Sequence, residues 1–95
     1  MEKTEKIILD GNYMKTREKT HEYLKKKLQL PDYYGNNLDA LWDILSTCSE
    51  GMDIDFINKE RLIDYLGEYG RTMLEVFKDA ELENKYIKFR EKSLF

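Results

Sequence analysis

The sequence predicts a small α/β protein in which about four helices pack on a three-stranded parallel sheet. Three short segments rich in apolar residues, 6–10, 53–58 and 85–90, are expected to form strands. The stretches between them are long enough for helical crossovers, which favour parallel pairing with right-handed connections. The chain has 95 residues, 41% of them hydrophobic, so we expect one core and a single domain over residues 1–95.

The first strand, Lys6–Asp10, ends in a turn at Gly11. A helix is expected from about Thr16 to Leu28, where apolar residues recur at helical spacing among Lys and Glu. Pro31 limits this helix, because the residue before a proline disfavours the helical conformation.

The second helix is expected over Leu38–Thr47, with Asn37 as its N-cap, since the Asn37 side-chain oxygen can accept a bond from a free N–H of the first turn. Helical spacing gives this segment two faces. One face is apolar and carries Leu38, Leu41, Ile44 or Leu45, and Cys48. The other is acidic and aromatic and carries Asp39, Trp42, Asp43 and Ser46.

A third helix is expected to begin after a second cap, Asn58, and to reach about Tyr69. Two glycines, Gly67 and Gly70, loosen and end it. The fourth helix then begins at residue 71 or 72 and extends to about residue 83, before the last strand.

The two aspartates of the second helix are unusual as a pair. Asp39 and Asp43 stand four residues apart, where two carboxylates repel by about 0.2–0.5 kcal/mol in an isolated helix. Asp39 lies in the first turn, where the helix dipole favours an anion, but Asp43 lies beyond the reach of that effect. Helix stability therefore accounts for one aspartate better than for two.

Aromatic residues flank these aspartates. Tyr33 and Tyr34 precede the helix in a loop beside Gly35, and tyrosines next to a rigid acidic helix are typical of a recognition surface. Either tyrosine could instead fill the core beneath the loop. Trp42 has the same two options, because it can cover the base of the helix or present its edge to a partner.

Charge is distributed unevenly along the chain. Residues 32–68 contain nine acidic and two basic side chains, whereas residues 1–31 contain five acidic and eight basic ones. An acidic segment repels the phosphates of nucleic acid and suits a basic protein partner, since complementary fields raise association rates. The same charges could also form no more than a solvated surface.

Several classes of site and location are disfavoured. The single cysteine, Cys48, cannot form an internal disulfide, and with the single histidine, His21, it cannot supply a structural zinc site. We expect no cofactor or metal, and we interpret His21 as a surface residue and Cys48 as a small apolar one. The apolar run at residues 7–9 is too short for a signal peptide or a membrane span, so a cytoplasmic location is expected.

The run Tyr33–Asp43, Tyr-Tyr-Gly-Asn-Asn-Leu-Asp-Ala-Leu-Trp-Asp, resembles the signature of the barstar family, whose members are intracellular inhibitors of barnase-like extracellular ribonucleases. The first strand with its turn, the helix before Pro31 and the segment Leu74–Ala80 are also similar to that family. The resemblance spans nearly the whole chain, is strongest in the middle and implies a barstar-like fold.

The resemblance implies that the second helix and the loop before it enter the cleft of a basic secreted ribonuclease, where carboxylates occupy the places of RNA phosphates. Asp43 matches the family's central anchor, and Asp39 is its partner one turn earlier. Tyr33 matches the loop aromatic that packs against the nuclease, and Asp79 matches a peripheral acidic contact. We expect a monomer that forms a 1:1 complex through Tyr33, Tyr34, Gly35, Asn37, Asp39, Trp42, Asp43, Ser46, Thr47 and Asp79.

Two other functions remain open from the residues alone. An acidic interaction or immunity module of the same fold could bind a different basic toxin or regulator. An enzyme could use Asp39 and Asp43 as a carboxylate pair or a magnesium site. The sequence disfavours the enzyme, because no histidine, glycine-rich phosphate loop or further ligand lies near the two aspartates.

Overall fold

The computed structural model describes residues 4–92 and confirms the α/β class. Strands β1 (Thr4–Asp10), β2 (Gly51–Ile57) and β3 (Ile87–Lys92) form one parallel sheet in the order β1-β2-β3. The connections contain helices α1 (Arg17–Leu28), α2 (Leu38–Thr47), α3 (Lys59–Leu66) and α4 (Glu68–Glu83), and a 3-10 turn, η1 (Gly11–Tyr13). Residues 1–3 and 93–95 of the predicted single domain lie outside the described residues.

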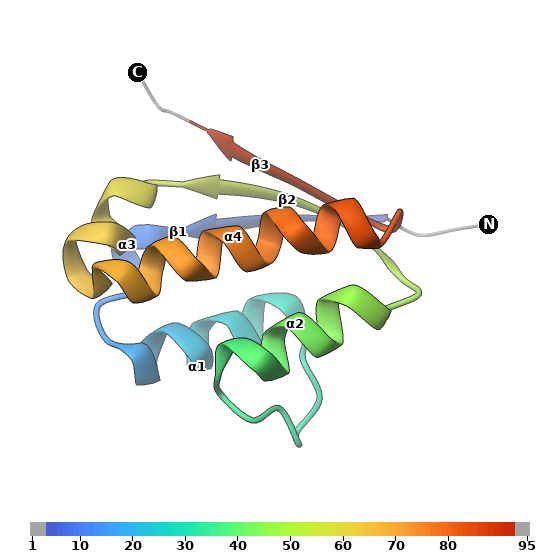
Figure 1. Cartoon of the computed structure of the whole chain (residues 1–95), viewed down its shortest axis with the longest axis horizontal. Helices are drawn as coiled ribbons and strands as arrows, with labels where there is room; N and C mark the ends of the chain where they lie inside the picture. The colour runs from blue at the N-terminus through green and yellow to red at the C-terminus, as the bar shows by residue number, and fades with distance from the viewer. Residues whose placement is uncertain (1–3, 93–95) are drawn as a thin grey trace.

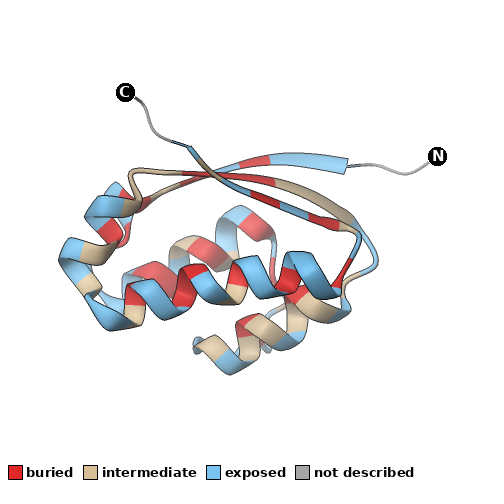
Figure 2. Ribbon diagram, turned by 45° about the horizontal axis from the view of Figure 1, so that its top comes forward, coloured by how far each residue is buried: buried red, intermediate tan, exposed pale blue. Residues whose placement is uncertain are grey.

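The helices lie on one side of the sheet (Figure 1). Helix α1 contacts β1 and α4 contacts β3, while α2 packs on α4, farther from the sheet (Figures 1 and 2). Helix α2 is therefore an outer element with one side free. Among the described residues, no helix is long and apolar enough to cross a membrane.

The core forms between the sheet and the helices, and α4 contributes much of it. On the side that faces the helices, each strand buries apolar side chains at alternate positions, namely Ile7, Leu9, Ile54, Phe56, Ile87 and Phe89. The rings of Phe56 and Phe89 have centroids 6.1 Å apart, and Phe77 of α4 stacks on Phe89 at 5.0 Å. Burial of each such side chain contributes about 1.5–3 kcal/mol, so these rings hold α4 against the sheet.

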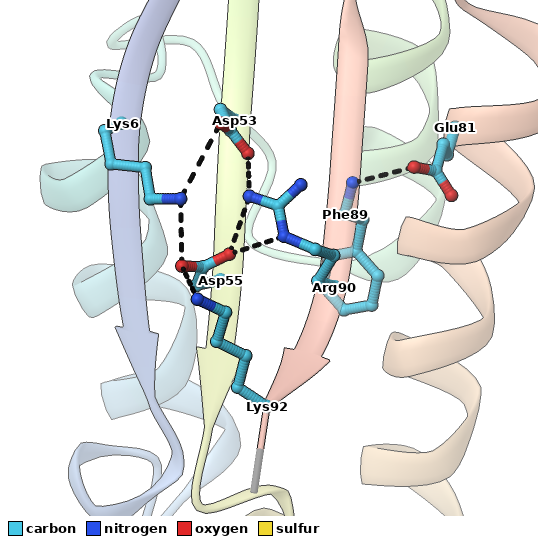
Figure 3. Close-up of polar contacts among 7 residues, drawn as sticks. All are labelled: Lys6, Asp53, Asp55, Glu81, Phe89, Arg90 and Lys92. Carbon is cyan, nitrogen blue, oxygen red and sulfur yellow. Dashed lines mark hydrogen bonds and ion pairs between the residues drawn. The ribbon is translucent and has the colours of Figure 1, made fainter.

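Charged side chains cover the outer face of the sheet (Figure 3). The Asp55 side chain is only 6% exposed, with Lys6 at 2.9 Å, Arg90 at 2.9 Å and Lys92 at 3.1 Å. Asp53 adds ion pairs with Lys6 and Arg90. The hydrogen bond from Lys6, followed by that from Lys92, lowers the pKa of Asp55 to about 2 despite its partial desolvation. Long basic side chains therefore take the place of a second helical layer.

The predicted boundary between the third and fourth helices is wrong. The helical path breaks at Gly67, which has a positive φ of 57°, and not after Tyr69. Helix α4 therefore begins at residue 68 and includes Gly70 in its first turn. A Cβ on Gly70 would lie 3.0 Å from both Cγ and O of Leu62, so this glycine allows α3 and α4 to pack closely.

Asn58 precedes α3 as predicted, but it does not cap that helix with its side chain. It adopts the left-handed conformation, with φ 57°, and its Nδ2 donates to Oδ1 of Asp10 at 2.8 Å. The carbonyl oxygen of Asn58 would lie 2.1 Å from a Cβ on Gly11. Only glycine fits at position 11. The hydrogen bond between Asn58 and Asp10 joins the ends of β1 and β2.

The last strand begins two residues later than predicted, at Ile87. Asn84 forms a turn before it, with its Oδ1 accepting from the N–H of Tyr86 at 3.0 Å and its carbonyl accepting from the N–H of Ile87. Further along, Oε2 of Glu81 in α4 accepts from the backbone N–H of Phe89 at 3.0 Å (Figure 3). This bond joins α4 to β3.

Candidate functional site

Helix α2 is fixed at its start by its own sequence. As predicted, Asn37 is the N-cap, and its Oδ1 accepts from the N–H of Ala40 at 2.7 Å. The Asn37 Nδ2 also donates to the carbonyl of Gly35 at 3.2 Å, which links the helix to the preceding loop. Leu41 and Leu45 are fully buried. Because these two leucines anchor one side of α2 in the core, the other side, which carries Asp39 and Asp43, faces the solvent.

The two carboxylates of α2 are exposed and have no ion-pair partner among the described residues. Both Asp39 and Asp43 are exposed. None of the ion pairs formed within residues 4–92 includes either of them. Trp42 lies between them in sequence and is half-buried. Part of its ring packs against the core and covers the base of the helix, and the rest is accessible to a partner. The charge of Asp39 and Asp43 remains available to a partner.

The end of α2 presents hydrogen-bond acceptors. The Ser46 and Thr47 hydroxyls donate to the carbonyl of Asp43, at 3.3 and 2.6 Å. Because their hydrogens are directed to the helix backbone, their oxygen lone pairs are left for outside donors. We call Tyr33, Asp39, Trp42, Asp43, Ser46 and Thr47 together the α2 surface. Its polar side chains suit a partner rich in N–H donors.

The loop before α2 separates its two tyrosines. Tyr33 is 85% exposed, whereas Tyr34 is 5% exposed and belongs to the core. Tyr34 therefore supports the loop from beneath and does not offer the surface contact expected for it. Gly35 is exposed, and a Cβ there would lie 3.3 Å from Nδ2 of Asn37. Little room exists for a larger residue beside the cap.

The interpretation of His21 as a surface residue is wrong. Its side chain is 1% exposed, with Nδ1 2.6 Å from the hydroxyl of Tyr34 and Nε2 2.6 Å from the hydroxyl of Tyr69. A neutral imidazole has one donor and one acceptor, so one hydroxyl donates to the ring and the other accepts from it. The guanidinium of Arg17 covers the Tyr69 ring at 4.1 Å. His21 thus connects α1, the Tyr34 loop and α4.

Burial lowers the pKa of His21 below its usual value of 6.5. The unfolded chain then binds a proton more readily than the folded one, so we expect stability to fall as the pH drops below 6.5 and to level off below the folded pKa. The slope from this group is at most about 1.4 kcal/mol per pH unit. Urea unfolding at a series of pH values measures it. His21 is the only histidine, so His21→Gln should have no such slope near pH 6.

The other end of α2 is held by Asn84, which the sequence did not single out. Its buried amide Nδ2 donates to the carbonyls of Leu45 at 2.9 Å and Cys48 at 2.8 Å. These carbonyls lie at the C-terminal end of α2, where backbone acceptors lack intrahelical partners. Asn84 therefore fixes α2 to the end of α4. Asp79, the peripheral contact implied by the resemblance, is exposed on α4.

A family model described as "Barstar (barnase inhibitor)" matches residues 4–92. The chain belongs to the barstar family. The chain is also similar to a Bacillus subtilis (strain 168) protein named "Putative ribonuclease inhibitor YrdF", to which it is 43% identical over 81 residues. That alignment covers 84% of this chain and 89% of the relative. The barstar model thus spans all the described residues.

Proposed function

We propose that this barstar-family chain inhibits a barnase-like extracellular ribonuclease by placing the α2 surface in the active-site cleft of the enzyme. One observation carries the proposal: Asp39 and Asp43 are exposed on a fixed helix and form no ion pair within residues 4–92. The chain acts as an inhibitor and not as an enzyme.

The chemistry of a ribonuclease cleft supports this function. Such a cleft holds RNA phosphates and the charged transition state, so it must contain cationic and N–H donor groups. A carboxylate accepts the same charge-assisted bonds, often two at once from one arginine. Because Asp39 and Asp43 form no ion pair within residues 4–92, binding breaks no ion pair of that part of the inhibitor. Tyr33 adds an exposed ring on the loop that precedes the helix.

The rigidity of the support favours tight binding. The Asn37 cap fixes the start of α2, Asn84 fixes its end, and His21 fixes the loop through Tyr34. A side chain that is already in its bound position loses less conformational entropy on association. More of the interaction energy then appears as affinity.

The experiment is a titration of a barnase-like ribonuclease with the purified chain while RNA cleavage is followed. We expect activity to fall to zero at one inhibitor per enzyme, and added salt to slow association. Full activity at a large excess of the chain would contradict the proposal. Binding to an unrelated basic toxin without ribonuclease inhibition would favour an acidic immunity module of the same fold.

A further inference from the structure

Strand β1 has one open edge. In the order β1-β2-β3 it pairs with β2 alone, so its other side has no strand partner within residues 4–92. The Asp10 N–H donates to the hydroxyl of Tyr23 at 3.0 Å and is therefore turned away from β2. Because the peptide groups alternate in direction along a strand, the N–H and C=O groups of Lys6 and Ile8 point to the same open edge. These groups are available for pairing.

Apolar surface flanks this edge on both faces of the sheet. Ile8 is 49% exposed on the outer face, close to the charged network around Asp55. On the helix side, Tyr13 is 63% exposed, and its ring stacks on that of Tyr23 with the centroids 5.4 Å apart. Since the Tyr23 hydroxyl reaches the backbone of Asp10, the ring pair lies beside the end of the strand. A chain that paired with β1 would remove part of this apolar surface from water.

The outer-face side chains of β1 are complementary to the same strand in reverse. In an antiparallel pair of β1 strands with a twofold axis at Ile8, Ile8 lies opposite Ile8 of the second copy, and Lys6 lies opposite Asp10. Lys6 has a donor left for this contact, because an ammonium has three and its ion pairs are with Asp53 and Asp55. An axis one or two residues earlier would place Lys6 opposite Ile8 or opposite a second lysine. The charges therefore favour the axis at Ile8.

We propose that two copies of this chain associate through their β1 edges, antiparallel to each other, so that their two sheets become one. Ile8 exchanges two backbone hydrogen bonds with Ile8 of the second copy, and the Lys6 N–H donates to the carbonyl of Asp10. The Asp10 N–H stays with Tyr23, so the pairing ends there. One strand pair is a small interface, and the association is therefore weak and depends on concentration.

The dimer is independent of the proposed function. The α2 surface shares no residue with β1, so a dimer would carry two α2 surfaces. The free chain at high concentration would then not be the monomer expected from its sequence.

Sedimentation equilibrium at rising protein concentration tests the association. We expect the weight-average mass of the parent chain to rise toward that of two chains. Ile8→Lys should lose the dimer completely, because two lysines would face each other across the twofold axis. In its own sheet the new lysine lies beside Asp55, the register partner of residue 8, so the variant should fold. Urea unfolding of the dilute protein checks this.

Leu82→Ser is the matched control, because it removes another exposed aliphatic side chain, which lies on α4. It should dimerise like the parent chain. A parent chain that stays monomeric at the highest concentration would overturn the inference. If that monomer pairs through Lys6 and Ile8 with a different protein, the edge belongs to that partner. A dimer that persists in Ile8→Lys would use another surface, and the inference would again be wrong.

Cross-linking tests the register in a Cys48→Ala background, which has no other cysteine. Ile8→Cys should form a disulfide dimer with oxidised glutathione, since opposite residues have Cα atoms about 5.5 Å apart, within the range of a disulfide. Lys6→Cys should not, because the two copies of residue 6 are about 14 Å apart along the strands. A disulfide dimer from Lys6→Cys alone would overturn the proposed register and its charge pairing.

Discussion

Asp43→Ala is expected to weaken binding to a barnase-like ribonuclease by more than about 2 kcal/mol, which is at least about 30-fold in Kd. The reason is geometric. Asp43 lies in the middle of α2, between the Tyr33 loop and the Ser46–Thr47 end, so it would be the most enclosed carboxylate in the complex. Its removal leaves cationic groups of the enzyme desolvated without a partner, and that cost adds to the lost attraction.

Inhibition titrations and surface-binding kinetics measure the effect. Asp39→Ala should cause a smaller loss, since Asp39 lies nearer the start of the helix. Asp64→Ala is a matched control, because Asp64 is an exposed aspartate on α3 and its removal changes the net charge equally. Far-ultraviolet circular dichroism should be the same for all three variants. Unchanged inhibition by Asp43→Ala would remove the basis of the proposed binding surface.

The second large effect is expected on stability, from His21→Ala. This change opens a cavity and leaves the hydroxyls of Tyr34 and Tyr69 without their partner, so unfolding should become easier by about 2–4 kcal/mol. Chemical unfolding in urea at pH 7.5 measures the change. Tyr34→Phe, which removes a single hydroxyl, should cost only about 1 kcal/mol.

The same variant also tests the role of the loop. Tyr33 is exposed on a loop whose inner side is anchored by Tyr34 and His21. We therefore expect His21→Ala to slow productive association with the ribonuclease at a temperature where the variant remains folded, since a looser loop pays more entropy on binding. Equal stability of His21→Ala and the parent chain would show that the two hydroxyls find other partners.

The sequence was sufficient for the elements and for the exposed acids. Strong local signals account for this success: strands with period two, the Asn37 cap and the paired aspartates are all legible within a few residues. Boundaries failed where tertiary packing decides them. Gly70 was interpreted as a helix end, but its lack of a side chain serves the contact with Leu62.

The supports of the site were missed because their partners are distant in sequence. His21 contacts Tyr34 and Tyr69, 13 and 48 residues away, and Asn84 contacts the end of α2, 36 to 39 residues away. One signal for His21 was present: it stands three residues before Leu24 and so lies on the buried face of α1. No local pattern marks Asn84.

The bond between Glu81 and Phe89 has a consequence for how the protein behaves at high concentration. Strand β3 is the outermost strand on its side of the sheet, and an unoccupied backbone N–H there is a template for pairing with a foreign strand. The Glu81 carboxylate already occupies the Phe89 N–H. To pair with β3, an incoming strand would have to displace the Glu81 carboxylate from the Phe89 N–H. The displaced carboxylate would also repel the carbonyl oxygens of that strand. Helix α4 thereby protects this border of the sheet against aggregation.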